Sequence, residues 1–186
     1  MLILALDTSG NMCTAALVDD SGLVAQTVFR HKMDLLQRFA PSIEWLLNDS
    51  RLSVDDLDAI AVSLGPGSFT GLRIGVTTAK SIAFAAGKKL IGIPTLDILA
   101  AGVMTEHGDV VAPLIHARPE EVYTALYRVD DTSPHKLTDD LALPTRELLD
   151  KALGLKSNRV IFCGSGCRTN ISVIEDFLGD KAIFAP

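Results

Sequence analysis

Aromatic residues and positive charge are both scarce in this sequence. Phe, Trp and Tyr make up 5% of its 186 residues, and 17 Lys and Arg stand against 23 Asp and Glu, which gives a formal net charge of −6. Such a chain offers no basic surface from which binding to a phosphate backbone would release counterions. We therefore do not expect it to bind nucleic acid on its own.

Long hydrophobic runs are absent as well. The longest stretch without a charged residue, 59–72, has 14 residues and is interrupted by three glycines and a proline, whereas a membrane-spanning helix needs about 20 consecutive apolar residues. The N-terminus has no basic segment and reaches a carboxylate at Asp7, which argues against a signal or transit peptide. We expect no association with a membrane.

Cysteine and histidine are few. Cys13, Cys163 and Cys167 are too scattered for a disulfide framework, and no second cysteine pair completes a zinc site. This usage predicts a reducing, cytoplasmic setting. The histidines do not show the spacing of a helix-borne metal site, so we expect no metal. They are His31, His107, His116 and His135.

Apolar residues, by contrast, make up 48% of the chain and give it a mean hydropathy of +0.30. They occur in short runs and in helical spacings that alternate along the chain, which predicts an α/β protein. Strands are expected at 2–7, 13–18, 23–29, 59–64, 90–93, 110–115, 122–129, 159–163 and 182–184. Helices are expected at 34–48, 70–86, 95–105, 145–153 and 169–178.

The start of the chain is similar to a later segment. Residues 2–20 and 110–131 both contain a strand, a polar turn, a second strand with a Thr-Ala pair, and a closing pair of acidic residues. This weak internal repeat indicates two related halves joined near residues 100–109. We place the two units at 1–105 and 106–186.

A glycine-rich loop follows the predicted strand 59–64. It has four glycines in the eleven residues 65–75, which permit positive φ angles and close backbone approach. Its spacing fits neither a P-loop nor a dinucleotide-binding motif. Two interpretations stay open, a tight strand-to-helix turn and a loop whose amides hold an anion. The motif loop consists of Gly65, Pro66, Gly67, Ser68, Phe69 and Thr70.

The helix after this loop has two distinct stripes. One consists of small residues that recur every four positions, and the other is mostly polar. Small residues permit close approach of another helix, either within the same unit or from a second subunit. We take the subunit contact as the hypothesis, with Gly71, Arg73, Gly75, Thr77, Ala79, Lys80 and Ala83 as the partner interface.

Two further groups of polar residues follow strand ends. Asp7, Thr8 and Ser9 suit a site where a carboxylate and hydroxyls meet phosphate, although a turn explains them equally. The corresponding turn of the second half reads His116-Ala117-Arg118 and lacks a carboxylate. Arg118, Glu121 and Tyr123 form a second-unit motif whose simplest interpretation is a surface ion pair.

Several segments together resemble one protein family. ILALDTS at 3–9, AIAVSLGPGSFTGLRIGVTTAKSIAFA at 59–85, IGIPTLDILA at 91–100 and ARPEEVYTALY at 117–127 are similar to the TsaB (YeaZ) family. The similarity runs through most of residues 1–130, and GPGSFTGLRIG is specific to that family.

The resemblance implies a duplicated actin-like (ASKHA, ribonuclease H-like) fold and a place in bacterial tRNA threonylcarbamoyladenosine synthesis. It implies a non-catalytic scaffold that binds a TsaD-like catalytic subunit, with a TsaE-like ATPase as a further partner and a homodimer in isolation. Contact with tRNA would occur only through the complex. The chain alone would bind no cofactor, whereas ATP or ADP would sit at an interface of the complex, and Asp7, Thr8 and Ser9 would be a vestigial nucleotide site.

The sequence departs from the family pattern in three places. The family has a His-Ser pair before the first helix, where this chain reads Leu35-Leu36-Gln37-Arg38 and His31 is displaced. His116 stands where the family has Asp, and the chain ends some tens of residues before its relatives do, either because the second unit is shortened or because its last strand or helix is missing. A small ASKHA-type ATPase or phosphotransferase that uses Asp7 remains an alternative. A glycoprotease-type metallopeptidase is disfavoured, because no paired histidines are present.

Overall fold

The computed structural model describes residues 1–30, 33–130 and 133–185, so His31 lies outside the described residues. The chain forms two compact units, Met1–Thr95 and Leu96–Pro186. The division falls ten residues before the predicted 105/106 boundary. It falls there because the helix α3 (Thr95–Ala101) buries Leu96 and Ala100 in a core of the second unit.

The first unit is built on one five-stranded sheet in the order β3-β2-β1-β4-β5. β1 pairs antiparallel with β2 and parallel with β4, and β4 pairs parallel with β5. The strands are β1 (Ile3–Asp7), β2 (Met12–Asp19), β3 (Gly22–Arg30), β4 (Ala59–Ser63) and β5 (Lys89–Ile93). The helices are α1 (Leu35–Asp49), the short η1 (Val54–Asp56) and α2 (Phe69–Ala86).

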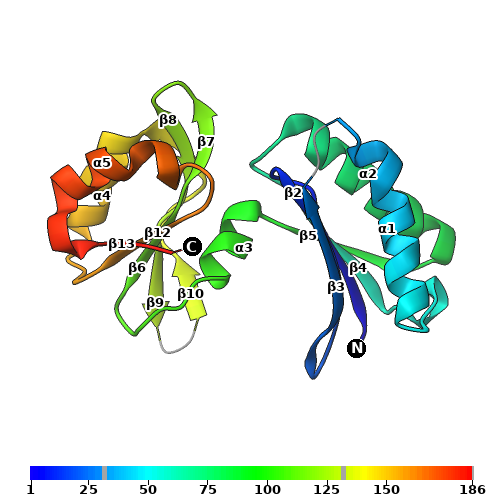
Figure 1. Ribbon diagram of the computed structural model, residues 1–186. Helices are drawn as coiled ribbons and strands as arrows, with labels where there is room; N and C mark the ends of the chain where they lie inside the picture. The colour runs from blue at the N-terminus through cyan, green and yellow to red at the C-terminus, as the bar shows by residue number, and fades with distance from the viewer. Residues whose placement is uncertain (31–32, 131–132, 186) are drawn as a thin grey trace. The chain divides into compact units, whose positions relative to one another are not determined.

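Helices α1 and α2 lie against the same face of this sheet (Figure 1). Strand alternation turns Leu4 and Leu6 toward the helices, and the apolar side chains of α1 recur at helical spacing to meet them. Phe39, in the second turn of α1, is 1% exposed. The amphipathic pattern of 34–48 therefore predicts both the helix and the face that it buries.

Two helix ends of the first unit match their sequence signals. Gly87 terminates α2 in the left-handed conformation at φ 63°, which glycine adopts without steric cost. Ser53 and Asp56 form a capping box at η1, in which the Ser53 backbone N–H donates to Asp56 Oδ2 at 2.7 Å.

The second unit contains a five-stranded sheet in the order β10-β9-β6-β12-β13 and a separate three-stranded sheet in the order β11-β8-β7. The strands are β6 (Val110–Pro113), β7 (Ile115–Arg118), β8 (Glu121–Thr124), β9 (Tyr127–Asp130), β10 (Ser133–Lys136), β11 (Leu141–Pro144), β12 (Val160–Cys163) and β13 (Ala182–Phe184). The helices besides α3 are α4 (Thr145–Gly154), α5 (Cys167–Leu178) and the short η2 (Gly179–Lys181).

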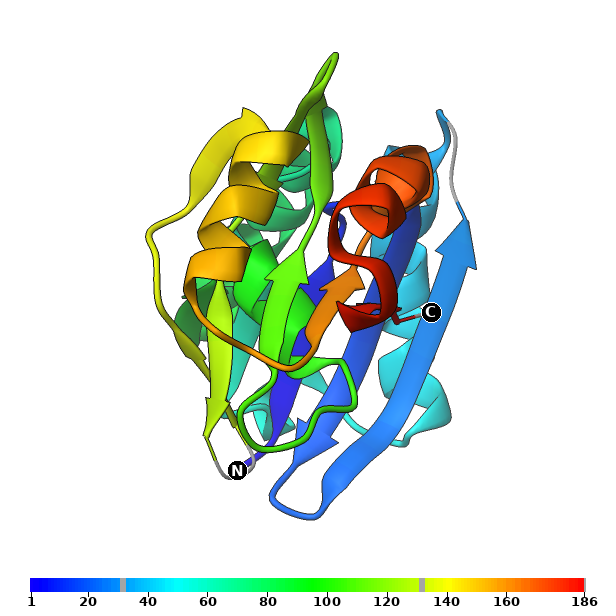
Figure 2. The ribbon, with the colours of Figure 1, turned by 90° about the vertical axis from the view of Figure 1, so that its left-hand side faces the viewer.

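Helices cover both faces of the larger sheet of the second unit. α4 and α5 lie over one face, which is turned toward the viewer in Figure 2. Phe162 of β12 is fully buried in the core that these helices cover. α3 covers the opposite face, where it packs with Val111 and Ile161. Tyr127 fixes this helix further, because its hydroxyl donates to Asp97 Oδ1 at 2.6 Å.

The two five-stranded sheets share one topology. The central strand is β1 in the first sheet and β6 in the second. On one side of it lie an antiparallel strand and then an edge strand, and on the other side lie two parallel strands. The weak repeat in the sequence therefore reflects a real duplication of the fold.

The internal details of the repeat prediction are wrong. Residues 122–129 do not form a single strand, because β8 and β9 belong to different sheets. The chain leaves one sheet for the other at Leu126, whose N–H donates to the Thr138 hydroxyl at 3.0 Å and whose carbonyl accepts from Leu137. His116 and Arg118 lie in β7 and do not form the turn that follows the counterpart of β1. That counterpart, β6, ends at Pro113.

Candidate functional site

The glycine-rich loop and the start of α2 pack closely against Thr8 and Ser9, the two residues that follow β1. The Ser68 N–H donates to the Ser9 carbonyl at 2.7 Å, and the Thr8 hydroxyl donates to the Gly71 carbonyl at 2.8 Å. A β-carbon added at Gly67 or Gly71 would overlap the backbone of Ser9 or Thr8. These glycines are therefore required by close packing of the loop on the strand end.

A side chain of this loop caps the helix that follows. Ser68 is the N-cap of α2, and its hydroxyl accepts from the Gly71 N–H at 3.2 Å. Gly65, at φ 106°, adopts the positive φ that the turn requires, and its carbonyl accepts from the Thr95 N–H. The loop is thus a tight strand-to-helix turn, and anion binding by its remaining amides stays a prediction.

Asp7 lies half-buried at the end of β1 beside this loop. Its Oδ1 accepts hydrogen bonds from the Ser63 hydroxyl at 2.7 Å and from the Ser9 N–H at 2.8 Å. Thr8 is fully buried and Ser9 is 8% exposed. The Thr8 hydroxyl points into the unit, where it donates to the Gly71 carbonyl, so it is not available to a nucleotide; the vestigial nucleotide site stays a prediction.

The predicted partner interface on α2 divides into two faces. The small residues Gly71, Gly75, Ala79 and Ala83 are all buried within the first unit. A β-carbon at Gly75 would overlap the Thr8 hydroxyl. Close approach by the small stripe therefore serves packing within the first unit, and the prediction that it contacts a second subunit is wrong.

The other three predicted residues, Arg73, Thr77 and Lys80, are exposed. They continue into a stripe with an aromatic ring at each end, since Phe69 is 74% and Phe84 is 91% exposed. At the start of the stripe the Arg73 guanidinium lies 5.4 Å from the centre of the Phe69 ring. We call these five residues the α2 stripe.

A shallow apolar groove lies beside the α2 stripe, between α1 and α2. It contains two adjoining hollows of about 470 and 380 Å³ that share Thr77 and Thr78. Leu36 of α1 lines it and is 72% exposed. The sequence analysis missed Leu36, although its place directly after the buried Leu35 signals a second apolar face on that helix.

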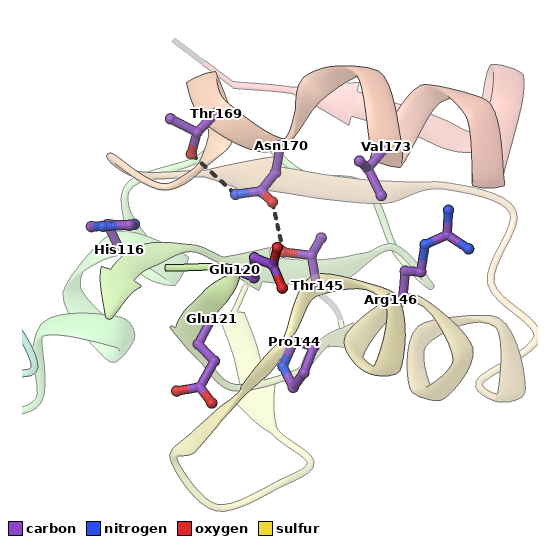
Figure 3. A pocket seen from close by; sticks show the side chains of 9 residues that line it. All are labelled: His116, Glu120, Glu121, Pro144, Thr145, Arg146, Thr169, Asn170 and Val173. Atoms are coloured by element: carbon purple, nitrogen blue, oxygen red, sulfur yellow. Dashed lines mark hydrogen bonds between the residues drawn. The ribbon is translucent and has the colours of Figure 1, made fainter. Parts of the chain in front are cut away.

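The polar residues of the second unit surround a different pocket. Arg118 and Glu121 are paired through their backbones at the end of the β7–β8 hairpin. Their side chains do not form the expected ion pair with each other in the part of the chain that the structure describes. Tyr123 is half-buried in β8. Glu121 instead lines a pocket of about 500 Å³, together with side chains from the starts of α4 and α5 (Figure 3).

The described residues contain neither a cluster suited to a metal ion nor a helix suited to span a membrane. No group of three or more His, Cys, Asp or Glu side chains among them is placed to hold a metal ion. None of the helices among these residues is both long and apolar enough to cross a membrane.

The duplicated sheet order, with helices against each sheet, defines the class of protein as an actin-like ASKHA fold of two ribonuclease H-like units. A hexokinase of the ROK type from Thermus thermophilus shares this fold with a TM-score of 0.56 at 11% identity, covering 99% of this chain and 92% of that one. This likeness concerns the fold alone.

Closer relatives give the family. The chain is 34% identical over 181 residues to the tRNA threonylcarbamoyladenosine biosynthesis protein TsaB of Bacillus subtilis, which covers 97% of this chain and 78% of that protein. YeaZ from Pseudomonas aeruginosa superposes with a TM-score of 0.82 at 27% identity, covering 99% of this chain and 83% of the other. The chain belongs to the TsaB (YeaZ) family.

The family is related to a group of enzymes. Residues 30–179 match the family model described as TsaD, tRNA N6-adenosine threonylcarbamoyltransferase. A protein of that name from Thermodesulfovibrio yellowstonii is 29% identical over 174 residues, or 83% of this chain and 52% of that protein.

Proposed function

We propose that this chain is a non-catalytic scaffold subunit of the bacterial machinery that makes N6-threonylcarbamoyladenosine in tRNA, and that it binds a TsaD-like transferase through the α2 stripe. The α2 stripe itself is the observation that carries the docking proposal. Two phenylalanines, 74% and 91% exposed, lie on one helix face with two cations and no acidic residue between them.

The chemistry of the stripe indicates what a partner must offer. Covering an exposed Phe is worth about 1.5–3 kcal/mol, and aromatic and Arg side chains are enriched at the centres of protein interfaces. Acidic groups on the partner surface would complement the positive charges of Arg73 and Lys80. We infer a partner helix with apolar residues that enter the groove beside Thr77 and carboxylates that face the two cations.

The non-catalytic part of the proposal rests on a difference between the two units. In the first unit the central strand ends in a carboxylate, Asp7. In the second unit the corresponding strand ends at Pro113 and is followed by Leu114 and Ile115. A phosphoryl-transfer site with a carboxylate from each unit would therefore be incomplete in this chain.

An ATPase or phosphotransferase that depends on Asp7 is the alternative enzymatic function. It predicts ATP hydrolysis by the purified chain that is lost in Asp7→Ala. Our proposal predicts no hydrolysis by the chain alone, with ATP or ADP bound only at an interface of the complex. The proposal also includes a TsaE-like ATPase in the complex and contact with tRNA through the partners only. In isolation, two copies of the chain would pair through the α2 stripe, and the chain would act in the cytoplasm.

Reconstitution of the modification tests the proposal. A TsaD-like subunit, a TsaE-like subunit, tRNA and the threonylcarbamoyl donor are combined with the wild-type chain, with F84S or K80E, or with the control K89E, whose exposed lysine lies on β5 outside α2. We expect modification with the wild type and the control, and its loss with the two stripe variants. Equal modification without the chain would contradict the scaffold role.

A further inference from the structure

The pocket of the second unit plays no part in the docking proposed for α2. Its volume of about 500 Å³ falls in the range of small-molecule sites, about 300–1,000 Å³. Three structural elements contribute charged or polar side chains to it. The β7–β8 hairpin supplies Glu120 and Glu121, α4 supplies Arg146, and α5 supplies Asn170.

Charges of both signs line this pocket. The structure shows no hydrogen bond or ion pair for the side chains of Glu120, Glu121 or Arg146 anywhere in residues 1–30, 33–130 and 133–185. In the view of Figure 3, Arg146 lies to one side of the two glutamates, beside Val173. The carboxylates and the guanidinium are thus available to a ligand that carries both signs.

The wall between the two helix starts is held in place by side-chain hydrogen bonds. Asn170 Nδ2 donates to the Gly166 carbonyl at 2.8 Å, and Asn170 Oδ1 accepts from the buried Thr145 hydroxyl at 2.7 Å. Asn170 therefore ties the start of α5 to the start of α4 (Figure 3). Pro144 and Val173 add apolar surface to the same pocket.

We propose that this pocket binds a free α-amino acid with a small side chain. The ammonium group faces Glu120 and Glu121, the carboxylate faces Arg146, and the side chain lies against Val173. A simple anion would be repelled by the two glutamates, and a simple cation by Arg146, whereas a zwitterion is attracted by both. The inference uses residues of the second unit only and does not depend on the proposed docking of α2.

Four small probes test the charge requirement by calorimetric or NMR titration of the full chain. L-threonine and L-valine are both zwitterions of nearly the same shape, N-acetyl-L-threonine lacks the ammonium group, and L-threoninamide lacks the carboxylate. We expect saturable binding of at least one zwitterion, and binding about tenfold weaker for each blocked threonine, because each loses one charged contact.

Variants then assign each charge to its partner. E120Q/E121Q should weaken the binding of the zwitterion about tenfold and should not weaken that of N-acetyl-L-threonine, an anion that the two glutamates repel. R146Q should likewise weaken the binding of the zwitterion about tenfold and should not weaken that of L-threoninamide, a cation that Arg146 repels. The controls E175Q and R168Q, on α5 and outside the pocket, should leave all four affinities unchanged.

Three results would overturn this inference. The first is no saturable binding of either zwitterion up to about 10 mM. The second is equal affinity for the blocked and unblocked threonines. The third is an effect of the control variants as large as that of the pocket variants, which would indicate general charge attraction in place of a site.

Discussion

Gly75 of α2 lies directly against Thr8, the residue that follows β1, so that a β-carbon at position 75 would overlap the Thr8 hydroxyl. The same hydroxyl donates to the Gly71 carbonyl one helical turn earlier. This relationship orients α2. It holds the small-residue face of the helix on the sheet and leaves the α2 stripe exposed.

Replacing Gly75 by Ala should destabilise the first unit, because the new β-carbon would overlap the Thr8 hydroxyl, which is fully buried and held by the Gly71 carbonyl. Overpacking of this kind costs about 1–3 kcal/mol. Urea denaturation of G75A measures the loss. The control T77A, on the exposed face of the same helix, should change the free energy of unfolding by less than about 0.5 kcal/mol.

The second variant in this test isolates the contact itself. Adding T8A to G75A removes the methyl and hydroxyl groups that the new β-carbon meets. The double variant should lose less stability than the sum of the two single variants. Strict additivity would contradict the contact between Gly75 and Thr8.

The ion pair between Asp109 and Arg159 should contribute to stability at neutral pH. Asp109 is 4% exposed, and its Oδ1 and Oδ2 accept from Arg159 Nε at 2.9 Å and Nη2 at 2.7 Å. These hydrogen bonds lower the pKa of the Asp109 carboxyl below its usual value. The stabilisation is therefore complete above the unfolded-state pKa and is lost as the pH falls through the lower folded-state pKa.

Asp109→Asn should accordingly cost about 1.5–3 kcal/mol at pH 7 and progressively less as the pH falls below about 4. Unfolding curves of D109N and wild type across this range measure the difference. The control D180N changes an exposed carboxylate of η2 and should show little effect. A cost for D109N that is independent of pH would contradict the electrostatic account.

The three cysteines should be unreactive in the folded chain. Burial raises the pKa of Cys13, Cys163 and Cys167 to about 12, so almost no thiolate is present at pH 8. We expect no labelling by a thiol-disulfide reagent until denaturant is added, and then labelling of all three. Because the unfolded thiols ionise near pH 9, the stability of the fold should fall as the pH rises above that value. Rapid labelling of the native chain would contradict this.

Short-range sequence patterns predicted the elements of the first unit well. The expected helix 70–86 starts one residue after the observed first residue, Phe69, and ends at the observed last residue, Ala86. Its ends were predictable because the glycine-rich loop precedes the helix and Gly87 terminates it. The spacing of small residues also predicted one bare face on this helix. It did not show whether that face meets β1 or another subunit, since this depends on Thr8, more than sixty residues away in the sequence.

The second unit was harder to predict. β10 has the sequence SPHK and pairs with β9, but it lacks the apolar alternation that marks a strand. Val122 and Val129 lie in one apolar run whose strands join different sheets, and the hydrogen bond of the Leu126 N–H to Thr138 that accompanies the switch is long-range. The pocket at Glu121 likewise combines segments that the sequence keeps far apart.

The α2 stripe is the central claim of the account, and affinity for a purified TsaD-like subunit tests it most directly. We expect Phe84→Ser to weaken that affinity at least tenfold, since an aromatic hot-spot contact is worth about 2 kcal/mol or more, while the unfolding free energy stays near that of wild type because Phe84 is 91% exposed. The matched control F177S changes a phenylalanine of α5 that is 38% exposed and should bind normally. Wild-type affinity of F84S for the TsaD-like subunit would contradict the claim.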